Sequence, residues 1–186
     1  MRAAIVDEFG PLEAIRIGEM PAPQLKPGHV LIAVKAAGVG FVDALGAAGK
    51  YQVKQALPFV PGGEYAGIVE SVGEGVTGIA PGDRVMAGGF AGAYAEYALA
   101  PAGAVLAMPA SMSFVEAAGF RTNYATALHA LADRAAIAPG ETLLVLGAGG
   151  GTGIAAIQIG KLLGARVIAA ASSAEKRAAA LAAGAD

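Results

Sequence analysis

The fold is decided by the stretch Gly140–Lys161, which reads GETLLVLGAGGGTGIAAIQIGK. Its apolar run Leu143–Leu146 predicts a buried strand, and a cluster of glycines follows that run directly. A helix-forming apolar run, Ile154–Leu163, comes next, and a second predicted strand covers Arg166–Ala171. A strand, a glycine turn, a helix and a second strand at this spacing form one βαβ unit, Thr142–Ala171.

The glycine cluster suits the phosphates of a dinucleotide. Glycines allow a sharp turn off the strand, close approach of a pyrophosphate to the backbone, and close packing of helix on strand. The N–H groups and the positive dipole end of the following helix then face the phosphates. A P-loop is excluded because Ile154 and Ala155, rather than a Lys-Ser or Lys-Thr pair, follow the cluster. We therefore predict cofactor contacts from the whole loop: Gly147, Ala148, Gly149, Gly150, Gly151, Thr152 and Gly153.

The amino-acid composition limits the classes of protein to which this chain can belong. With 186 residues, of which 55% are hydrophobic and 15% charged, the chain should be globular, with one large domain or two small ones. The net charge of −2 and the lack of a Lys/Arg run give no support for a nucleic-acid partner. Cysteine is absent, which excludes disulfides and thiolate metal sites. Neither a secretory signal nor a membrane helix is evident, so we expect a cytoplasmic location and no membrane partner.

Residues 1–112 read as short strands separated by Gly and Pro turns. Many short strands at such spacing indicate a barrel-like β-domain rather than a parallel sheet. One short helix, Phe41–Ala48, interrupts them. The predicted strands are Met1–Asp7, Ala14–Glu19, Val30–Ala37, Tyr65–Val72, Arg84–Ala87, Gly92–Ala98 and Ala104–Ala107.

From Ser113 onward the sequence is rich in alanine and predicts helices. We place the domain boundary within this region, with domains at 1–122 and 123–186. Glu116 stands three residues after Ser113, as in a capping box. The predicted caps and helices are Ser113 with a helix through Ala118, Asn123 with Tyr124–Ala135, and Ser173 with Ala174–Ala183.

The last 64 or so positions hold only two predicted strands of a parallel sheet. Two strands and their helices cannot bury both faces of such a sheet. We therefore expect the sheet to continue in a longer protein. We also expect these 186 residues alone to expose apolar surface and to be a poor enzyme.

Both halves of the chain resemble the medium-chain dehydrogenase/reductase superfamily. The glycine run, down to Gln158 and Lys161, is similar to the signature of its quinone oxidoreductase (zeta-crystallin-like) branch. The N-terminal segments that carry the likeness read AAGVGFVDALGAAGKYQ, PFVPGGEYAGIVESVGEGV and GDRVMA. The resemblance implies a mixed fold: a GroES-like β-barrel catalytic domain, then the first part of an α/β Rossmann domain, truncated here, with the active site in the cleft between the domains.

The resemblance also implies a zinc-free protein. Zinc-using members carry Cys where this chain has Gly40 and His where it has Gly63, and their cysteine-rich structural loop is missing. The two histidines, His29 and His129, have no partner at metal-ligand spacing, so we predict no metal site. The retained Glu64 could be a general acid, but we favour a structural hydrogen-bonding role.

Three further contacts follow from the resemblance. Tyr51 of GKYQ is placed at the nicotinamide side of the cleft and is the predicted catalytic residue. Thr126 of YATALHAL resembles the family threonine that approaches the nicotinamide, and Phe41 is another predicted cofactor contact. The alternatives remain open: Tyr51 as an ordinary core or surface aromatic, and Thr126 as a helix threonine bonded to its own backbone.

The end of the second strand favours NADPH over NADH. NAD sites commonly carry Asp or Glu there to hold the ribose hydroxyls. This chain instead continues with Ser172 and Ser173, and then with Lys176 and Arg177. Hydroxyls beside a cation suit a 2′-phosphate, so we predict NADPH contacts from Ser172, Ser173 and Lys176. The alternative is a solvated helix face, which the neighbouring Glu175 favours.

These features together predict a zinc-independent, NADPH-dependent oxidoreductase that transfers hydride to a quinone or an α,β-unsaturated carbonyl. Such acceptors are already electrophilic, so the protein needs to supply placement rather than a metal. A 2-enoyl reductase, with CoA thioesters among its substrates, is one alternative, and a non-catalytic nucleotide-binding protein of the same fold is another. The expected partner is a small-molecule substrate, and we expect a homo-oligomer in the full-length protein.

Overall fold

The computed structural model describes all 186 residues, which form two compact units, Met1–Arg121 and Thr122–Asp186. The division falls one residue before the boundary expected from the sequence. Each unit has a hydrophobic core of its own. Val30, Ile32 and Tyr65 lie in the core of the first unit, and Val145, Ile157 and Val167 lie in that of the second.

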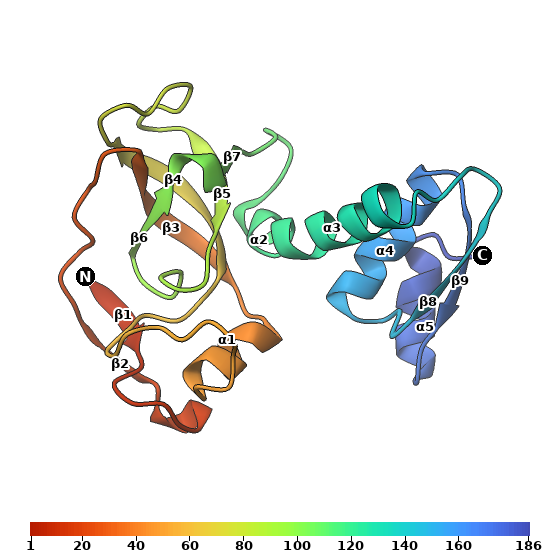
Figure 1. Cartoon of the computed structure of the whole chain (residues 1–186), viewed down its shortest axis with the longest axis horizontal. Coiled ribbons are helices and arrows are strands. Elements are labelled where there is room, and N and C mark those ends of the chain that lie inside the picture. The colour runs from red at the N-terminus through yellow and green to blue at the C-terminus, as the bar shows by residue number, and fades with distance from the viewer. The chain divides into compact units, whose positions relative to one another are not determined.

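The first unit is built on a five-stranded antiparallel sheet with the strand order β6-β3-β4-β5-β7 (Figure 1). Its strands are β3 (His29–Gly38), β4 (Glu64–Val72), β5 (Arg84–Gly88), β6 (Tyr97–Pro101) and β7 (Val105–Ala107). A two-stranded antiparallel pair stands apart from this sheet and consists of β1 (Arg2–Ile5) and β2 (Arg16–Glu19). The helical elements are η1 (Leu12–Ala14), α1 (Phe41–Ala47), η2 (Ala102–Ala104) and α2 (Phe114–Ala118).

Alternation along β3 determines which side chains enter the core. Val30 and Ile32 are fully buried, while Lys35 is exposed. The pairing of β3 with β4 shifts register twice, between Leu31 and Ile32 and again between Val34 and Ala36. Such irregularities bend a strand and increase its twist, which helps a sheet to curl toward a barrel. The alternation that favours a half-buried strand is therefore confirmed in its first half and interrupted in its second.

The strand predicted over Gly92–Ala98 is wrong, because only Tyr97 and Ala98 belong to β6. Before them, Gly92 has φ of +104°, outside the strand region, and its N–H donates to the Val60 carbonyl at 2.8 Å. The next residues continue this loop pairing, and only an isolated bridge joins Ala95 to Ala3. Long-range loop contacts thus decide the conformation here.

The second unit contains the predicted βαβ arrangement. The parallel pair β8 (Thr142–Leu146) and β9 (Arg166–Ala170) flanks α4 (Gly151–Leu162), and α5 (Ala174–Ala182) follows β9 (Figure 1). Helix α4 begins at Gly151, three residues before the predicted apolar run. Ser173 caps α5 as predicted, because its hydroxyl accepts from the Lys176 N–H at 3.2 Å.

The helical segments that precede β8 are α3 (Arg121–Leu128) and a π-helical segment, η3 (His129–Arg134). Together they replace the single helix predicted over Tyr124–Ala135. Asn123 is not the cap of that helix, because α3 begins two residues earlier and Asn123 lies inside it.

The predicted capping box of α2 is confirmed: Ser113 Oγ accepts from the Glu116 N–H at 3.2 Å, and Glu116 accepts from the Ser113 N–H at 2.8 Å.

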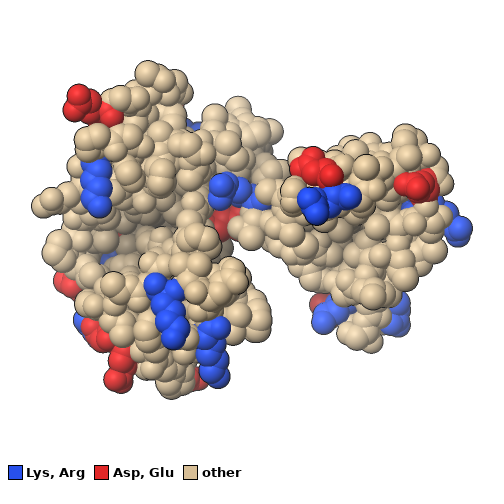
Figure 2. Space-filling model, viewed as in Figure 1, with Lys and Arg blue, Asp and Glu red and all other residues tan.

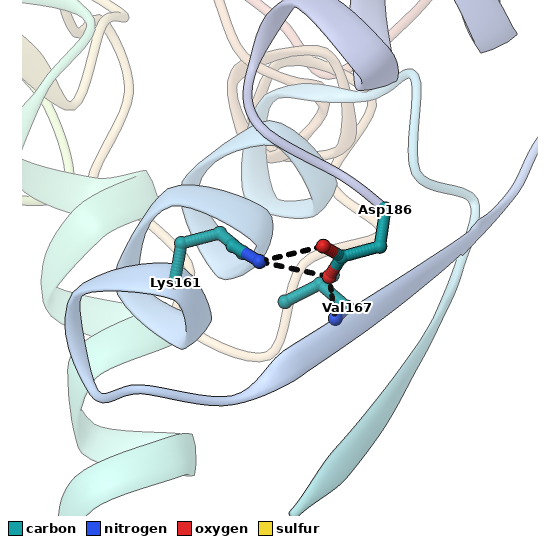
Figure 3. A network of polar contacts seen from close by, with 3 residues as sticks. All are labelled: Lys161, Val167 and Asp186. Atoms are coloured by element: carbon teal, nitrogen blue, oxygen red, sulfur yellow. Dashed lines mark hydrogen bonds and ion pairs between the residues drawn. The ribbon is translucent and has the colours of Figure 1, made fainter. Parts of the chain in front are cut away.

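Asp186 joins α4 to the start of β9 (Figure 3). Its oxygens Oδ1 and Oδ2 accept hydrogen bonds from Lys161 Nζ at 2.9 and 2.8 Å, and Oδ2 also accepts from the Val167 N–H at 2.7 Å. In return, the Asp186 N–H donates to the Val167 carbonyl. These contacts hold the pKa of Asp186 below its ordinary value, chiefly through the hydrogen bond from Lys161.

The surface of the molecule has two plain features. Apolar side chains of β8 and β9 are open to solvent, with exposed fractions of 58% for Leu144 and 75% for Leu146. Lys and Arg side chains lie scattered among uncharged residues on the face drawn in Figure 2, without a continuous basic patch. None of the helices combines the length and apolar character needed to span a lipid bilayer.

Candidate functional site

A pocket of about 510 Å³ lies where β8 and β9 end, at the carboxyl edge of the parallel pair. This edge is where open α/β sheets bind their ligands. The lining residues are Gly147, Gly149, Gly150, Ala170, Ala171, Ser172 and Lys176. The pocket therefore brings glycines of the loop together with Ser172 and Lys176. Both of these residues follow the second strand and are predicted NADPH contacts.

The turn off β8 depends on Gly147, whose φ of +67° lies in the left-handed region. The loop is tied to β9 by the Ala148 N–H, which donates to the Ala170 carbonyl at 3.0 Å. Gly150 then stands at the N-cap of α4, and no side chain caps this helix. The N–H groups of the first turn of α4 are therefore left for an anion.

Two of the residues predicted to contact the cofactor instead pack against the glycine loop on the side away from the pocket. A Cβ atom on Gly153 would come within 2.6 Å of the Gly147 carbonyl oxygen and within 2.8 Å of Ala148 Cα. Ala148 itself is completely buried. Gly153 and Ala148 are thus packing positions, and they do not line the pocket.

Lys176 lies across the loop from the first turn of α5. A Cβ atom on Gly149 would meet Lys176 Cβ at 2.5 Å, so the aliphatic stem of the lysine runs directly over this glycine. The Lys176 ammonium takes part in no ion pair. The neighbouring Arg177 is engaged elsewhere, because its Nη1 donates to the Ala171 carbonyl at 3.2 Å. Lys176 is therefore the unpaired cation of the pocket.

Thr152 is turned toward α3. Its hydroxyl donates to Asn123 Oδ1 at 2.9 Å, and a Cβ atom on Gly151 would lie 2.9 Å from Asn123 Nδ2. A second link joins the two helices, because the Tyr124 hydroxyl donates to Gln158 Oε1. Asn123 thus braces the start of α4, a role that the sequence did not indicate because the contact spans 29 positions.

The remaining predicted residues do not line this pocket. Ser173 serves as the cap of α5, and Thr126 is exposed on α3. Phe41 and Tyr51 belong to the first unit, where Phe41 is 79% exposed and the Tyr51 ring packs against Phe90 with ring centroids 6.4 Å apart. Roles for these residues at a nicotinamide stay predictions. Sequence reasoning missed Ala170 and Ala171, because their backbone and methyl groups carry no chemical signal.

In the first unit, a carboxylate lies beside Gly40 and Gly63. Asp43 Oδ2 accepts from the Gly40 N–H at 2.7 Å and from the Tyr94 hydroxyl at 2.9 Å. A Cβ atom on Gly63 would lie 3.6 Å from Asp43 Oδ1. Burial, followed by the hydrogen bond to Asp43, raises the pKa of Tyr94 above its ordinary value. Asp43 and Tyr94 form a polar pair that the sequence did not single out.

No three His, Cys, Asp or Glu side chains come together as a metal site. His129 faces Asp133 alone, with Nδ1 2.9 Å from Oδ2, and His29 contacts the Pro27 carbonyl. The prediction of a zinc-free protein thus rests on the donor set, in which glycines occupy both family ligand positions.

Comparison with known proteins identifies the family of this chain. The alcohol dehydrogenase GroES-like domain family matches residues 26–110. Human quinone oxidoreductase is 38% identical over 177 residues, which are 94% of this chain and 54% of the human protein. The chain belongs to the quinone oxidoreductase branch of the medium-chain dehydrogenase/reductase superfamily. It spans about half the length of the curated relatives it matches.

Solved oxidoreductase structures share both parts of the fold. A probable oxidoreductase from Mycobacterium abscessus matches 100% of this chain and 60% of its own, with a TM-score of 0.94 and 43% identity. The quinone oxidoreductase from Thermus thermophilus, solved also in complex with NADPH, matches 100% of this chain and 58% of its own, with a TM-score of 0.88 and 37% identity. The expected fold class, a GroES-like domain followed by the first part of a Rossmann domain, is confirmed.

Proposed function

We propose that this chain binds NADPH in the pocket at the ends of β8 and β9, and that the whole protein is an NADPH-dependent oxidoreductase. The observation that carries the proposal is Lys176, an unpaired cation in a pocket that no carboxylate lines. The Thermus thermophilus relative, which was solved with NADPH, supports it. Because the chain spans about half of its curated relatives, the activity is proposed for the whole protein.

The residues present fit the phosphates of this cofactor. Lys176 Nζ and the Ser172 hydroxyl would hold the 2′-phosphate through charge-assisted and ordinary hydrogen bonds. The pyrophosphate would lie against Gly149 and Gly150, facing the uncapped N-terminus of α4. An Asp or Glu in place of Ser172 would repel the 2′-phosphate, and its absence favours NADPH over NADH.

NADPH, when bound, supplies a hydride. The finer part of the proposal is that the acceptor is a quinone or another α,β-unsaturated carbonyl compound. Gly40 and Gly63 offer no metal ligand, so the acceptor has to be electrophilic on its own. The protein then contributes placement of the two reactants and exclusion of water.

The acceptor class is tested by supplying the whole protein with NADPH and either a simple quinone or a 2-enoyl thioester, and by following NADPH oxidation. Faster turnover of the quinone supports the proposal. Faster turnover of the thioester would assign a 2-enoyl reductase instead. NADPH binding without turnover of either compound would contradict an oxidoreductase and favour a nucleotide-binding protein of the same fold.

A further inference from the structure

The first turn of α4 consists almost entirely of glycine. Gly150 stands at the N-cap, and Gly151, Thr152 and Gly153 follow it. Glycine is a poor helix former, because it has the most backbone freedom to lose. The turn that faces the pocket is therefore held only weakly by its own sequence.

The missing cap of α4 leaves room for an anion. A capping side chain would accept from the N–H groups of the first turn and would compete with a phosphate for them. Gly150 has no such side chain, so these N–H groups have no partner within the helix. A site of this kind needs another means of fixing the turn.

Asn123 of α3 supplies a contact of that kind. Thr152 carries the only side chain in the first turn of α4, and its hydroxyl donates to Asn123 Oδ1 at 2.9 Å. A Cβ atom on Gly151 would lie 2.9, 3.0 and 3.1 Å from Asn123 Nδ2, Oδ1 and Cγ. These nearly equal distances mean that the carboxamide lies flat against Gly151. Asn123 thus contacts two consecutive residues whose N–H groups belong to the first turn.

A second contact between the two helices lies further along α4. The Tyr124 hydroxyl donates to Gln158 Oε1, and Gln158 stands nearly two helical turns beyond Thr152. Neither Tyr124 nor Gln158 lines the pocket. This contact holds the two helices together without touching the first turn, so it provides a matched comparison for Asn123.

We propose that Asn123 is a positioning residue for the pyrophosphate of the cofactor. The inference rests on the proposed function and deepens it. Asn123 does not line the pocket, so it acts by fixing the first-turn N–H groups of α4 in the direction that the phosphates need. Donors that are already in place need no ordering when the ligand binds, which favours affinity. The effect should not extend to the 2′-phosphate, which Lys176 and Ser172 would hold.

Two nucleotides separate the two phosphate sites in a calorimetric titration of the whole chain. ADP carries a pyrophosphate and no 2′-phosphate, whereas adenosine 2′-monophosphate carries a 2′-phosphate and no pyrophosphate. Asn123→Ala should weaken the binding of ADP and of NADPH by the same factor, about two- to tenfold, as expected for the loss of one hydrogen bond. Binding of adenosine 2′-monophosphate should be unchanged. A merely structural role would instead weaken both nucleotides together.

Variants of Thr152 test the same hydrogen bond from its other end. Thr152→Val removes the hydroxyl and should reproduce the loss of ADP binding, while Thr152→Ser keeps the hydroxyl and should bind ADP as wild type does. The double variant Asn123→Ala/Thr152→Val should lose little more than either single variant, because both remove one interaction. Tyr124→Phe is the control and should leave ADP affinity unchanged although it removes the other contact between the helices.

Circular dichroism shows whether each variant is folded, and Thr152→Val carries the test if Asn123→Ala is not. Undiminished ADP binding by these variants would overturn the inference and leave the proposed function intact. Equal losses of ADP and adenosine 2′-monophosphate binding would also overturn it, because they would indicate general loosening of the pocket. A wild-type chain that binds neither ADP nor NADPH would contradict the proposed function, and the inference with it.

Discussion

The stem of Lys176 runs over Gly149, so that a Cβ atom on this glycine would lie 2.5 Å from Lys176 Cβ. The contact couples the glycine loop after β8 to α5, which follows β9. The Ser173 cap sets the first turn of α5, and the bare glycine provides the space that the lysine stem needs. The Lys176 side chain is thus positioned jointly by the glycine loop and by the first turn of α5, which are far apart in the sequence.

The first prediction concerns two glycines of the loop that a Cβ atom would affect differently. Gly153→Ala should destabilise the second unit by about 1–3 kcal/mol, because the added methyl would overlap the Gly147 carbonyl oxygen, 2.6 Å away. Gly150→Ala is the matched control, since its methyl would lie 3.5 Å from the same oxygen at a φ of −91°. Chemical denaturation monitored by circular dichroism compares the two. Equal stabilities would show that the loop is not packed as described.

The Gly150 variant serves a second purpose. Gly150 lines the pocket, so its added methyl would occupy the space where the pyrophosphate approaches the backbone. NADPH affinity should therefore fall in Gly150→Ala although the fold is retained. Unchanged affinity in this variant would place the phosphates elsewhere.

The second prediction concerns acid stability. Because the folded state holds the pKa of Asp186 below its ordinary value of 3.8, the Lys161–Asp186 contact stabilises the fold above that value. The stabilisation is lost as the pH falls through the lowered pKa. Asp186→Asn should therefore be less stable than wild type at neutral pH, and the difference should shrink in acid. Denaturation midpoints measured from neutral pH downward test this.

A carboxylate with no side-chain partner provides the control for that series. Glu175 is exposed and takes part in no ion pair, so Glu175→Gln should follow the wild-type pH dependence. A difference between Asp186→Asn and wild type that stays constant down to strongly acidic pH would argue against the ion pair as its source.

The third prediction concerns alkaline pH. Burial raises the pKa of Tyr65 from 10.0 to about 12, so the folded state keeps this phenol protonated where the unfolded chain ionises it. The resulting stability is present below pH 10.0 and is lost as the pH rises toward about 12. The difference in phenolate absorbance between wild type and Tyr65→Phe should show a midpoint near 12 while the protein is folded. A midpoint near 10.0 in folded protein would mean that Tyr65 is accessible to solvent.

Local signals account for what the sequence predicted well. The Ser113–Glu116 capping box and the Ser173 cap both lie within three residues of their partners, and both form as predicted. The βαβ unit is likewise a continuous segment with an apolar strand on each side of its helix. The pocket was predictable in outline, because the glycine loop and the end of the second strand lie at one edge of a parallel sheet.

Long-range contacts account for what the sequence did not show. The strand expected over Gly92–Ala98 gives way to a loop because Gly92 pairs with Val60, more than thirty positions earlier. Asn123, a common helix-capping residue type, lies inside α3 and bonds Thr152, 29 positions later.

The central claim is that Lys176 recognises the 2′-phosphate of NADPH, and calorimetric titration of the chain with NADPH and NADH tests it most directly. Lys176→Met keeps the stem over Gly149 and removes only the charge. Wild type should prefer NADPH, and the variant should lose about 1.5–3 kcal/mol of NADPH binding, or roughly ten- to a hundredfold in affinity, with NADH little changed. Equal affinity of wild type for the two cofactors, or undiminished NADPH binding by Lys176→Met, would contradict the claim.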